Sequence, residues 1–328
     1  MVDAAGLGRQ LEGKTMAFPT AGGYRSIAAS SMKYVPTLYA SELLPVFNKK
    51  TLFKGISNTR YNGQITKQGD TIEIRSVPSF TIDDYRVGGG VNYRQPKSDP
   101  VTMLIDKGKS WAFPVNPVEQ VQSDITIVRT WAAQAGVDLQ VAIDADVLGN
   151  VYADAHASNI GNSAGADSGN IGMGVSGGTA ISVTTANGMR KITEMGQILD
   201  EESAPDEGRW VILPPWYWTV LINSDLKSAN MMGDSTSVMR NGQVGVIDKF
   251  KVYSSRNLGT TTDGSSDTCH YILFGTNDAI AFAMQLTQSE IVPNPDDYGK
   301  LYRSLVIYGY KVVKPEALGV MVAKQGSW

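Results

Sequence analysis

The chain has 328 residues, of which 42% are hydrophobic and 19% charged, with a formal net charge of −3. This composition predicts a folded chain, and the lack of a basic excess disfavours nucleic-acid binding as the main function. Cys269 is the single cysteine, which excludes an intrachain disulfide and fits a reducing compartment. We expect no signal peptide, no bilayer-spanning segment, no metal and no cofactor.

The first part of the chain offers little to a core. Residues 1–33 are rich in Gly, Ala, Ser and Thr, a composition typical of a flexible segment. Leu38 to Asn48 could form one short amphipathic helix, which Pro45 shortens or bends. We interpret residues 1–48 as an N-terminal arm.

A two-residue period begins after Gly69. Ile72 and Ile74 alternate with charged residues, Phe80 and Ile82 continue the pattern, and 101–105 repeat it on the return. The turn between the two runs consists of Arg86, Val87, Gly88, Gly89, Gly90, Val91 and Asn92. The pattern predicts a two-stranded ribbon of about 12 residues per strand, roughly 40 Å long. Such a ribbon needs another surface to lie on, and that surface can belong to a neighbouring subunit.

The strongest helical period follows. Asn116 suits an N-cap, and Glu119 lies three residues later. The predicted apolar stripe consists of Ile125, Val128, Ala132, Ala135, Leu139, Ala142, Val147 and Val151. Carried to Ala155, the helix has about 31 residues. Gly136 and Gly149 lie inside it as bending points or close-packing points.

The remaining chain predicts a mixed α+β architecture. Residues 158–182 are nearly all small or polar, and we expect an exposed loop or insertion there. We expect helices at 186–199 and after Pro214, a loop at 230–241, and strands at 210–213, 250–254, 271–275, 279–286 and 301–313.

Motifs for catalysis lack the context that they need. Gly172, Gly174 and Gly177 match G-x-G-x-x-G without the required strand and helix, and Ser176 matches G-x-S-x-G in a polar loop. Neither His156 nor His270 lies at metal-ligand spacing with other ligand types. The acidic pairs Asp83–Asp84 and Asp296–Asp297 are interpreted as solvated, and Trp210, Trp216, Tyr217 and Trp218 as core residues.

The order of these elements resembles the HK97-like major capsid fold of tailed bacteriophages. Several stretches are similar to capsid proteins of the group that includes the P22 coat protein: 34–36, 41–43, 69–71, 105–109, 121–124, 142–148, 240–245, 250–255, 257–258, 308–313 and 315–317. Departures are the N-terminal segment, the 158–182 insertion, and Asp248-Lys249 where a glycine is common.

The resemblance implies an α+β fold with named parts. These are an N-terminal arm (1–48), an E-loop hairpin (57–110), a P-domain with a long spine helix and the 158–182 insertion (111–185), an A-domain (186–282), P-domain return strands (283–314) and a C-terminal A-domain segment (315–328).

It also implies a function. A non-enzymatic major capsid protein assembles as hexamers and pentamers into an icosahedral shell, in the virion after assembly in the host bacterial cytoplasm. Implied partners are other copies, a portal protein, packaged double-stranded DNA in weak contact, and scaffolding and decoration proteins as further candidates. The hairpin tip Arg86–Asn92 would contact a neighbouring subunit, and an axial loop would contain Asp234, Arg240, Asn241 and Gly242. Alternatives are an encapsulin-like compartment, a tail or decoration protein, or a hydrolase using Ser176.

Overall fold

The computed structural model describes residues 51–60, 71–75, 80–84, 87, 93–95, 100–116, 127–224, 246–295 and 299–326. All of them belong to one compact unit, Pro45–Trp328. The predicted N-terminal arm up to residue 48 and the predicted helix start at Asn116 to Glu119, apart from Asn116 itself, lie outside the described residues.

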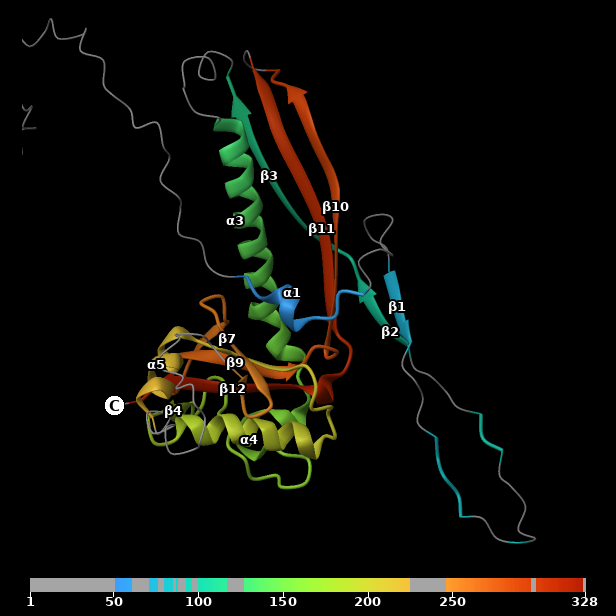
Figure 1. The fold of residues 1–328 in the computed structure, drawn as a ribbon, viewed down its shortest axis with the longest axis vertical. Coiled ribbons are helices and arrows are strands. Elements are labelled where there is room, and N and C mark those ends of the chain that lie inside the picture. Colours follow the sequence, from blue (N-terminus) through green and yellow to red (C-terminus); the bar gives the residue numbers. More distant parts are fainter. Residues whose placement is uncertain are drawn as a thin grey trace, which may run out of the picture. The chain divides into compact units, whose positions relative to one another are not determined.

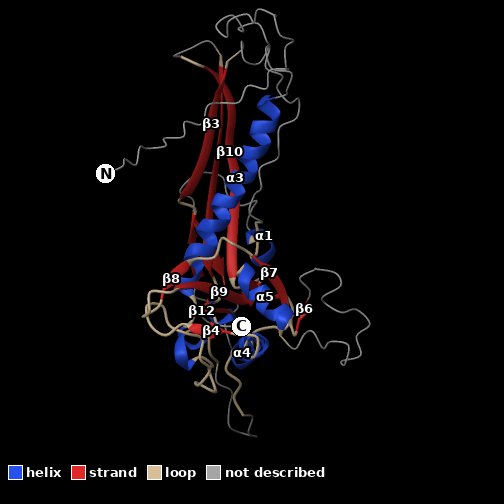
Figure 2. Cartoon of the chain, turned by 90° about the vertical axis from the view of Figure 1, so that its left-hand side faces the viewer, coloured by secondary structure: helices blue, strands red, loops and turns tan. Residues whose placement is uncertain are grey.

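A three-stranded antiparallel sheet, here called the long sheet, is formed by β3 (Lys107–Val115), β10 (Ile280–Pro293) and β11 (Lys300–Val312). The order is β10-β11-β3, so β11 is central. Pro114 cannot donate a ladder hydrogen bond, and it lies on the edge strand β3, where this loss is tolerated. Helix α3 (Ile127–Asn150) lies along this sheet (Figures 1 and 2).

Helix α3 confirms the predicted spine but corrects its boundary and its buried face. It ends at Asn150 and continues as a 3-10 turn, Val151–Asp154, so it does not remain α-helical to Ala155. Ile143, Val147 and Val151 are buried at steps of four, whereas Ala142 is exposed. The predicted stripe was wrong at Ala142 because its next step, to Val147, spans five residues and leaves the helical face.

A short hairpin pairs β1 (Thr71–Arg75) with β2 (Pro100–Leu104), in register from Thr71 opposite Leu104 to Arg75 opposite Pro100. Its alternation is confirmed, since Ile72 and Ile74 are buried between exposed neighbours. The predicted ladder of about 12 residues per strand was too long, because residues 80–84 and 93–95 form no strand. A two-stranded ribbon without a covering layer has little to stabilise it.

The rest of the described chain forms a lobe, defined here as the seven-stranded sheet with helices α4 (Gly188–Glu201) and α5 (Pro215–Asn223). Its strands are β4 (Ile181–Val183), β5 (Arg209–Leu213), β6 (Val246–Ile247), β7 (Phe250–Ser254), β8 (Thr260–Thr262), β9 (Thr268–Thr276) and β12 (Leu318–Gln325). The order is β4-β12-β9-β5-β7-β6, with β8 paired to β9. Shorter pieces are α1 (Phe53–Ile56) and the 3-10 turns Ala157–Asn159, Gly161–Ser163 and Pro315–Ala317.

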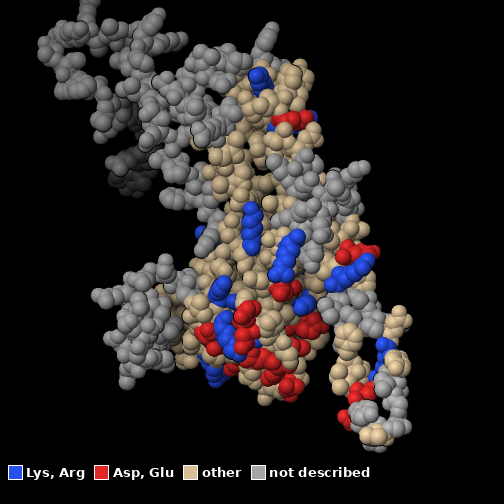
Figure 3. All heavy atoms as spheres, turned by 45° about the vertical axis from the view of Figure 1, so that its right-hand side comes forward, with Lys and Arg blue, Asp and Glu red and all other residues tan. Residues whose placement is uncertain are grey.

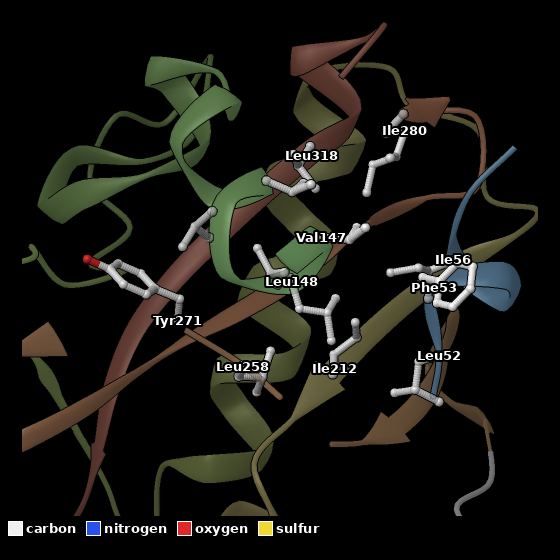
Figure 4. Packing of buried hydrophobic residues seen from close by; sticks show 14 of the residues in the cluster. Leu52, Phe53, Ile56, Val147, Leu148, Ile212, Leu258, Tyr271, Ile280 and Leu318 are labelled. Atoms are coloured by element: carbon white, nitrogen blue, oxygen red, sulfur yellow. The ribbon is translucent and has the colours of Figure 1, made fainter. Parts of the chain in front are cut away.

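Two apolar cores lie on opposite faces of this sheet, as the period of two requires. Along β5, Trp210 and Ile212 enter one core with α1 and α3, while Val211 and Leu213 enter the other with α4 and α5. In the first core, side chains of α1, α3, β5, β9 and β12 converge (Figure 4). The core interpretation is confirmed for Trp210 and Tyr217, which are buried, and Trp216 and Trp218 pack partly buried against the second core.

Residues 158–182 are a packed part of the lobe, which corrects the expected exposed loop. Ala164, Ile171 and Met173 are buried in the second core. The Met173 carbonyl accepts a hydrogen bond from the Val322 amide at 2.8 Å, and Lys191 Nζ donates to the Gly172 carbonyl at 2.9 Å. The small residues therefore pack closely over α4 and β12. Their composition alone had predicted an exposed loop.

Candidate assembly surfaces

The base of the hairpin is firmly packed on the long sheet. Ile72, Ile74, Met103 and Ile105 form a separate apolar cluster with Ala281, Ala283 and Ile307. Met103 and Ile105 have no exposed surface. One end of the hairpin is thus fixed to β10 and β11 by apolar contacts.

The described part of the hairpin beyond this base is instead exposed, and it presents four large apolar side chains beside charged and polar ones. The exposed fractions are 68% for Phe80, 89% for Ile82, 93% for Val87 and 96% for Tyr93. A single salt bridge, Arg94 to Asp83 at 3.2 Å, links the two arms. Exposed apolar side chains gathered on one projection are typical of a surface that a partner covers.

The structure describes only part of the predicted contact residues. Val87 is described, in a turn. Arg86, Gly88, Gly89, Gly90, Val91 and Asn92 lie outside the described residues, as do Asp234, Arg240, Asn241 and Gly242 of the predicted axial loop. That loop falls between the end of α5 at Asn223 and the start of β6 at Val246, both in the lobe.

The predicted bending points are both within α3. A Cβ atom built on Gly136 or on Gly149 would meet nothing within 4 Å. Gly136 lies mid-helix, whereas Gly149 is the penultimate residue and the backbone of Gly149 lies 3.6 Å from a Cβ built on Gly259. Close packing therefore does not account for the absence of a side chain at Gly136.

A buried carboxylate, that of Asp144, joins three separate parts of the chain. Its Oδ1 accepts hydrogen bonds from the backbone amides of Leu52 (2.8 Å) and Phe53 (2.9 Å) at the start of α1. Its Oδ2 accepts one from Asn257 Nδ2 at 2.6 Å, in the loop between β7 and β8. Asp144 has no exposed surface. The carboxylate from α3 thus satisfies amide donors at the N-terminus of α1, which has no capping side chain of its own.

A second acidic residue of α3, Asp146, ties the helix to the long sheet. Its Oδ2 accepts from Lys107 Nζ and from the Tyr308 hydroxyl, each at 2.9 Å, and Lys107 also donates to the Tyr310 hydroxyl at 2.7 Å. Burial lowers the pKa of Lys107, but the hydrogen bonds to Tyr310 and Asp146 outweigh it and raise this pKa above 10.5. Burial, and then the hydrogen bond to Asp146, raise the pKa of Tyr308. The lysine therefore stays charged at neutral pH.

Ser176 and the two histidines contact neighbouring side chains, and the neighbours of Ser176 would not activate it for catalysis. The Ser176 hydroxyl lies 2.7 Å from the Tyr271 hydroxyl and 3.1 Å from that of Thr261, and neither partner is a base that activates a serine at neutral pH. His270 Nδ1 accepts from Trp216 Nε1 at 3.4 Å, and His156 lies 3.6 Å from Glu202. Asp296 and Asp297 are outside the described residues.

Charge and hydropathy add two observations on the described part of the chain. Within it, no three His, Cys, Asp or Glu side chains gather as a metal site, and no helix has the length and apolar character of a membrane span. On the face drawn in Figure 3, acidic and basic side chains lie interspersed, most densely over one region. This distribution differs from the one-signed basic surface that holds phosphates.

Comparison with known proteins identifies a family. A family model described as phage capsid protein matches residues 118–321. A search of curated protein sequences found no match.

Solved structures match nearly the whole chain. A chain from Mycobacterium phage Che8 is 23% identical with a TM-score of 0.68, over 88% of this chain and 97% of that one. The capsid of cyanophage P-SCSP1u is 14% identical with a TM-score of 0.69, over 89% of this chain and 94% of that one. The capsid of Ralstonia phage GP4 is 15% identical with a TM-score of 0.61, over 93% of this chain and 100% of that one. The expected HK97-like α+β fold is thereby confirmed.

Proposed function

The chain belongs to the phage capsid protein family, and from this premise we propose that copies of it tile an icosahedral shell as hexamers and pentamers. Membership of the family makes the chain a structural protein of the virion capsid and not an enzyme. Rings of identical subunits close through contacts between two different faces of each copy. The proposal therefore needs a projecting face and a receiving face.

The hairpin is the projecting face in this proposal. The carrying observation is the exposure of Phe80, Ile82, Val87 and Tyr93 beyond a base that is itself buried. A stable subunit interface buries apolar side chains in its centre, and aromatic residues contribute most to it. The tip Arg86–Asn92 would then lie on a neighbouring copy, and the loop with Asp234, Arg240, Asn241 and Gly242 would surround the ring axis.

Packaged double-stranded DNA would be enclosed and only weakly contacted. The net charge of −3 and the mixed charges of Figure 3 support this part of the proposal, because strong binding to DNA requires many cationic contacts to phosphates. A portal protein, with scaffolding and decoration proteins as further candidates, would complete the particle, which assembles in the host bacterial cytoplasm.

Deleting Val87 to Val91 tests the hairpin contact. We expect a folded subunit that forms no closed shells, seen by negative-stain microscopy, with circular dichroism like that of the parent chain. A finer variant, Ile82→Ser, should weaken assembly in the same direction. Val175→Ser is the matched control, since Val175 is also exposed, at 41%, but lies on the 158–182 segment. Normal shells from the deletion variant would contradict the proposal.

A further inference from the structure

The main chain at the end of β2 crosses directly over one glycine of β11. A Cβ atom built on Gly309 would lie 2.3 Å from the Leu104 carbonyl oxygen and 3.1 Å from Ile105 Cα. Both are backbone atoms, which cannot rotate away as the end of a side chain can. Only glycine therefore permits the chain to cross at this height.

The residues around Gly309 are small, so the two segments of main chain pack closely where they cross. Ala283 is the strand partner of Gly309, and Ala281 lies two residues away on the same face of β10. Both alanines are buried in the apolar cluster that Met103 and Ile105 complete. Small side chains thus line the sheet where the hairpin leaves it, and close packing leaves no room for a larger one.

A small change at this point becomes a larger one farther along the hairpin. Restoring ordinary contact at Gly309→Ala requires the backbone at Leu104 to rise by about 1 Å. Over a ladder of five residue pairs, about 15 Å long, this is a tilt of roughly 4°. The described hairpin beyond the ladder then shifts by about 0.7 Å for every 10 Å of its distance from the ladder, which is enough to separate packed atoms across an interface.

We propose that Gly309 is a positioning residue that sets the angle at which the hairpin leaves the long sheet, and so the place where it meets a neighbouring copy. The inference rests on the proposed hairpin contact. Gly309 is buried within the subunit, so in this proposal its effect on assembly passes through the direction of β1 and β2.

Pulsed electron paramagnetic resonance on unassembled subunits tests the angle itself. Spin labels are attached at Glu73→Cys on β1 and Gln288→Cys on β10, both exposed positions, while the native Cys269 is buried. Gly309→Ala should shift the mean distance between the labels by about 1 Å or more and change its distribution. The control is Gly108→Ala on β3, where a Cβ would find only ordinary contacts, 3.8 Å from Leu305 Cδ1.

A second variant guards against poor folding of the first. Ala283→Gly removes a methyl group beneath the same crossing, so it should shift the label distance in the opposite direction. Unchanged distances in both variants would overturn the role of Gly309. A shifted distance with misassembled or absent shells supports it. A shifted distance with normal shells would instead refute the proposed hairpin contact on which it rests.

Discussion

Replacing the buried Asp144 of helix α3 by alanine should strongly destabilise the subunit. The substitution leaves three donors without an acceptor, namely the amides of Leu52 and Phe53 and the Nδ2 of Asn257. Because the carboxylate is completely buried, water cannot replace it without opening the core.

The magnitude follows from those donors. Each buried donor without a partner costs about 1–3 kcal/mol, which gives about 3–9 kcal/mol for three. The alanine variant no longer has to bury a charged group, and this offsets part of the loss. We therefore expect the free energy of unfolding to fall by about 3–5 kcal/mol. A domain has about 5–15 kcal/mol in all. Asp144→Ala should therefore leave the subunit close to unfolding.

Asparagine at the same position should cost much less, about 1–2 kcal/mol. Its carbonyl oxygen still accepts from the two amides of α1. Its NH₂ group would face Asn257, whose own Oδ1 is buried without a partner. Rotating the Asn257 amide by half a turn would pair the two groups.

Urea unfolding of unassembled subunits, followed by circular dichroism, measures these differences. The control is Asp138→Ala on the exposed side of α3, where Gln134 Nε2 donates to Asp138 at 2.9 Å; we expect a change within about 0.5 kcal/mol. Asp144→Ala within about 1 kcal/mol of the parent chain would refute the argument. Equal losses for the alanine and asparagine variants would refute the rotation of Asn257.

Three further changes have defined outcomes. Gly136→Ala should stabilise the subunit by about 1 kcal/mol, since the methyl group meets no atom, yet slow shell expansion measured by light scattering; unaltered expansion kinetics would count against a bend. Asp248→Gly should raise the free energy of unfolding by about 0.5–1 kcal/mol, because Asp248 has φ +54°; a lower melting temperature would contradict this. Burial lowers the pKa of His270 below 6.5, so the folded state is fully stable above that pH and loses stability as the pH falls through it. His270→Gln should flatten the fall in urea midpoint from about pH 8 to about pH 5, and an equally steep fall would exclude His270 as its source.

Local periodicity predicted the elements of this fold better than their extents. The helical period of α3 and the alternation of β1 each depend on one buried face, and the sequence predicted both, although it assigned Ala142 to the face that Ile143 occupies. Where a strand ends depends on what covers it, so the distal hairpin pattern at Phe80 and Ile82 continued past the real ladder. The 158–182 segment was misread for a related reason. Its few apolar residues, such as Ile171 and Met173, are buried by partners far away in the chain.

The two residues with the most specific roles, Asp144 and Gly309, are unusual for their places in the sequence. Asp144 stands among buried apolar neighbours on α3, and a carboxylate on that face needs buried donors. Gly309 interrupts a strand of β-branched and aromatic residues, a sign of close backbone approach. Neither signal identifies the partner. Leu52 lies 92 residues from Asp144 in sequence, and Leu104 lies 205 residues from Gly309. Only the fold brings each pair together.

The order of strands in the lobe bears on synthesis of the subunit. Strand β12 lies between β4 and β9, yet it follows both long strands, β10 and β11, along the chain. The ribosome must therefore synthesise β10 and β11 before β12 can join the sheet of the lobe. Contacts between strands so distant in sequence form slowly. During that interval the exposed hairpin belongs to an unfinished subunit. Because β12 comes last in the chain but lies inside the sheet, we expect shells to assemble from completed subunits and not from chains still being synthesised.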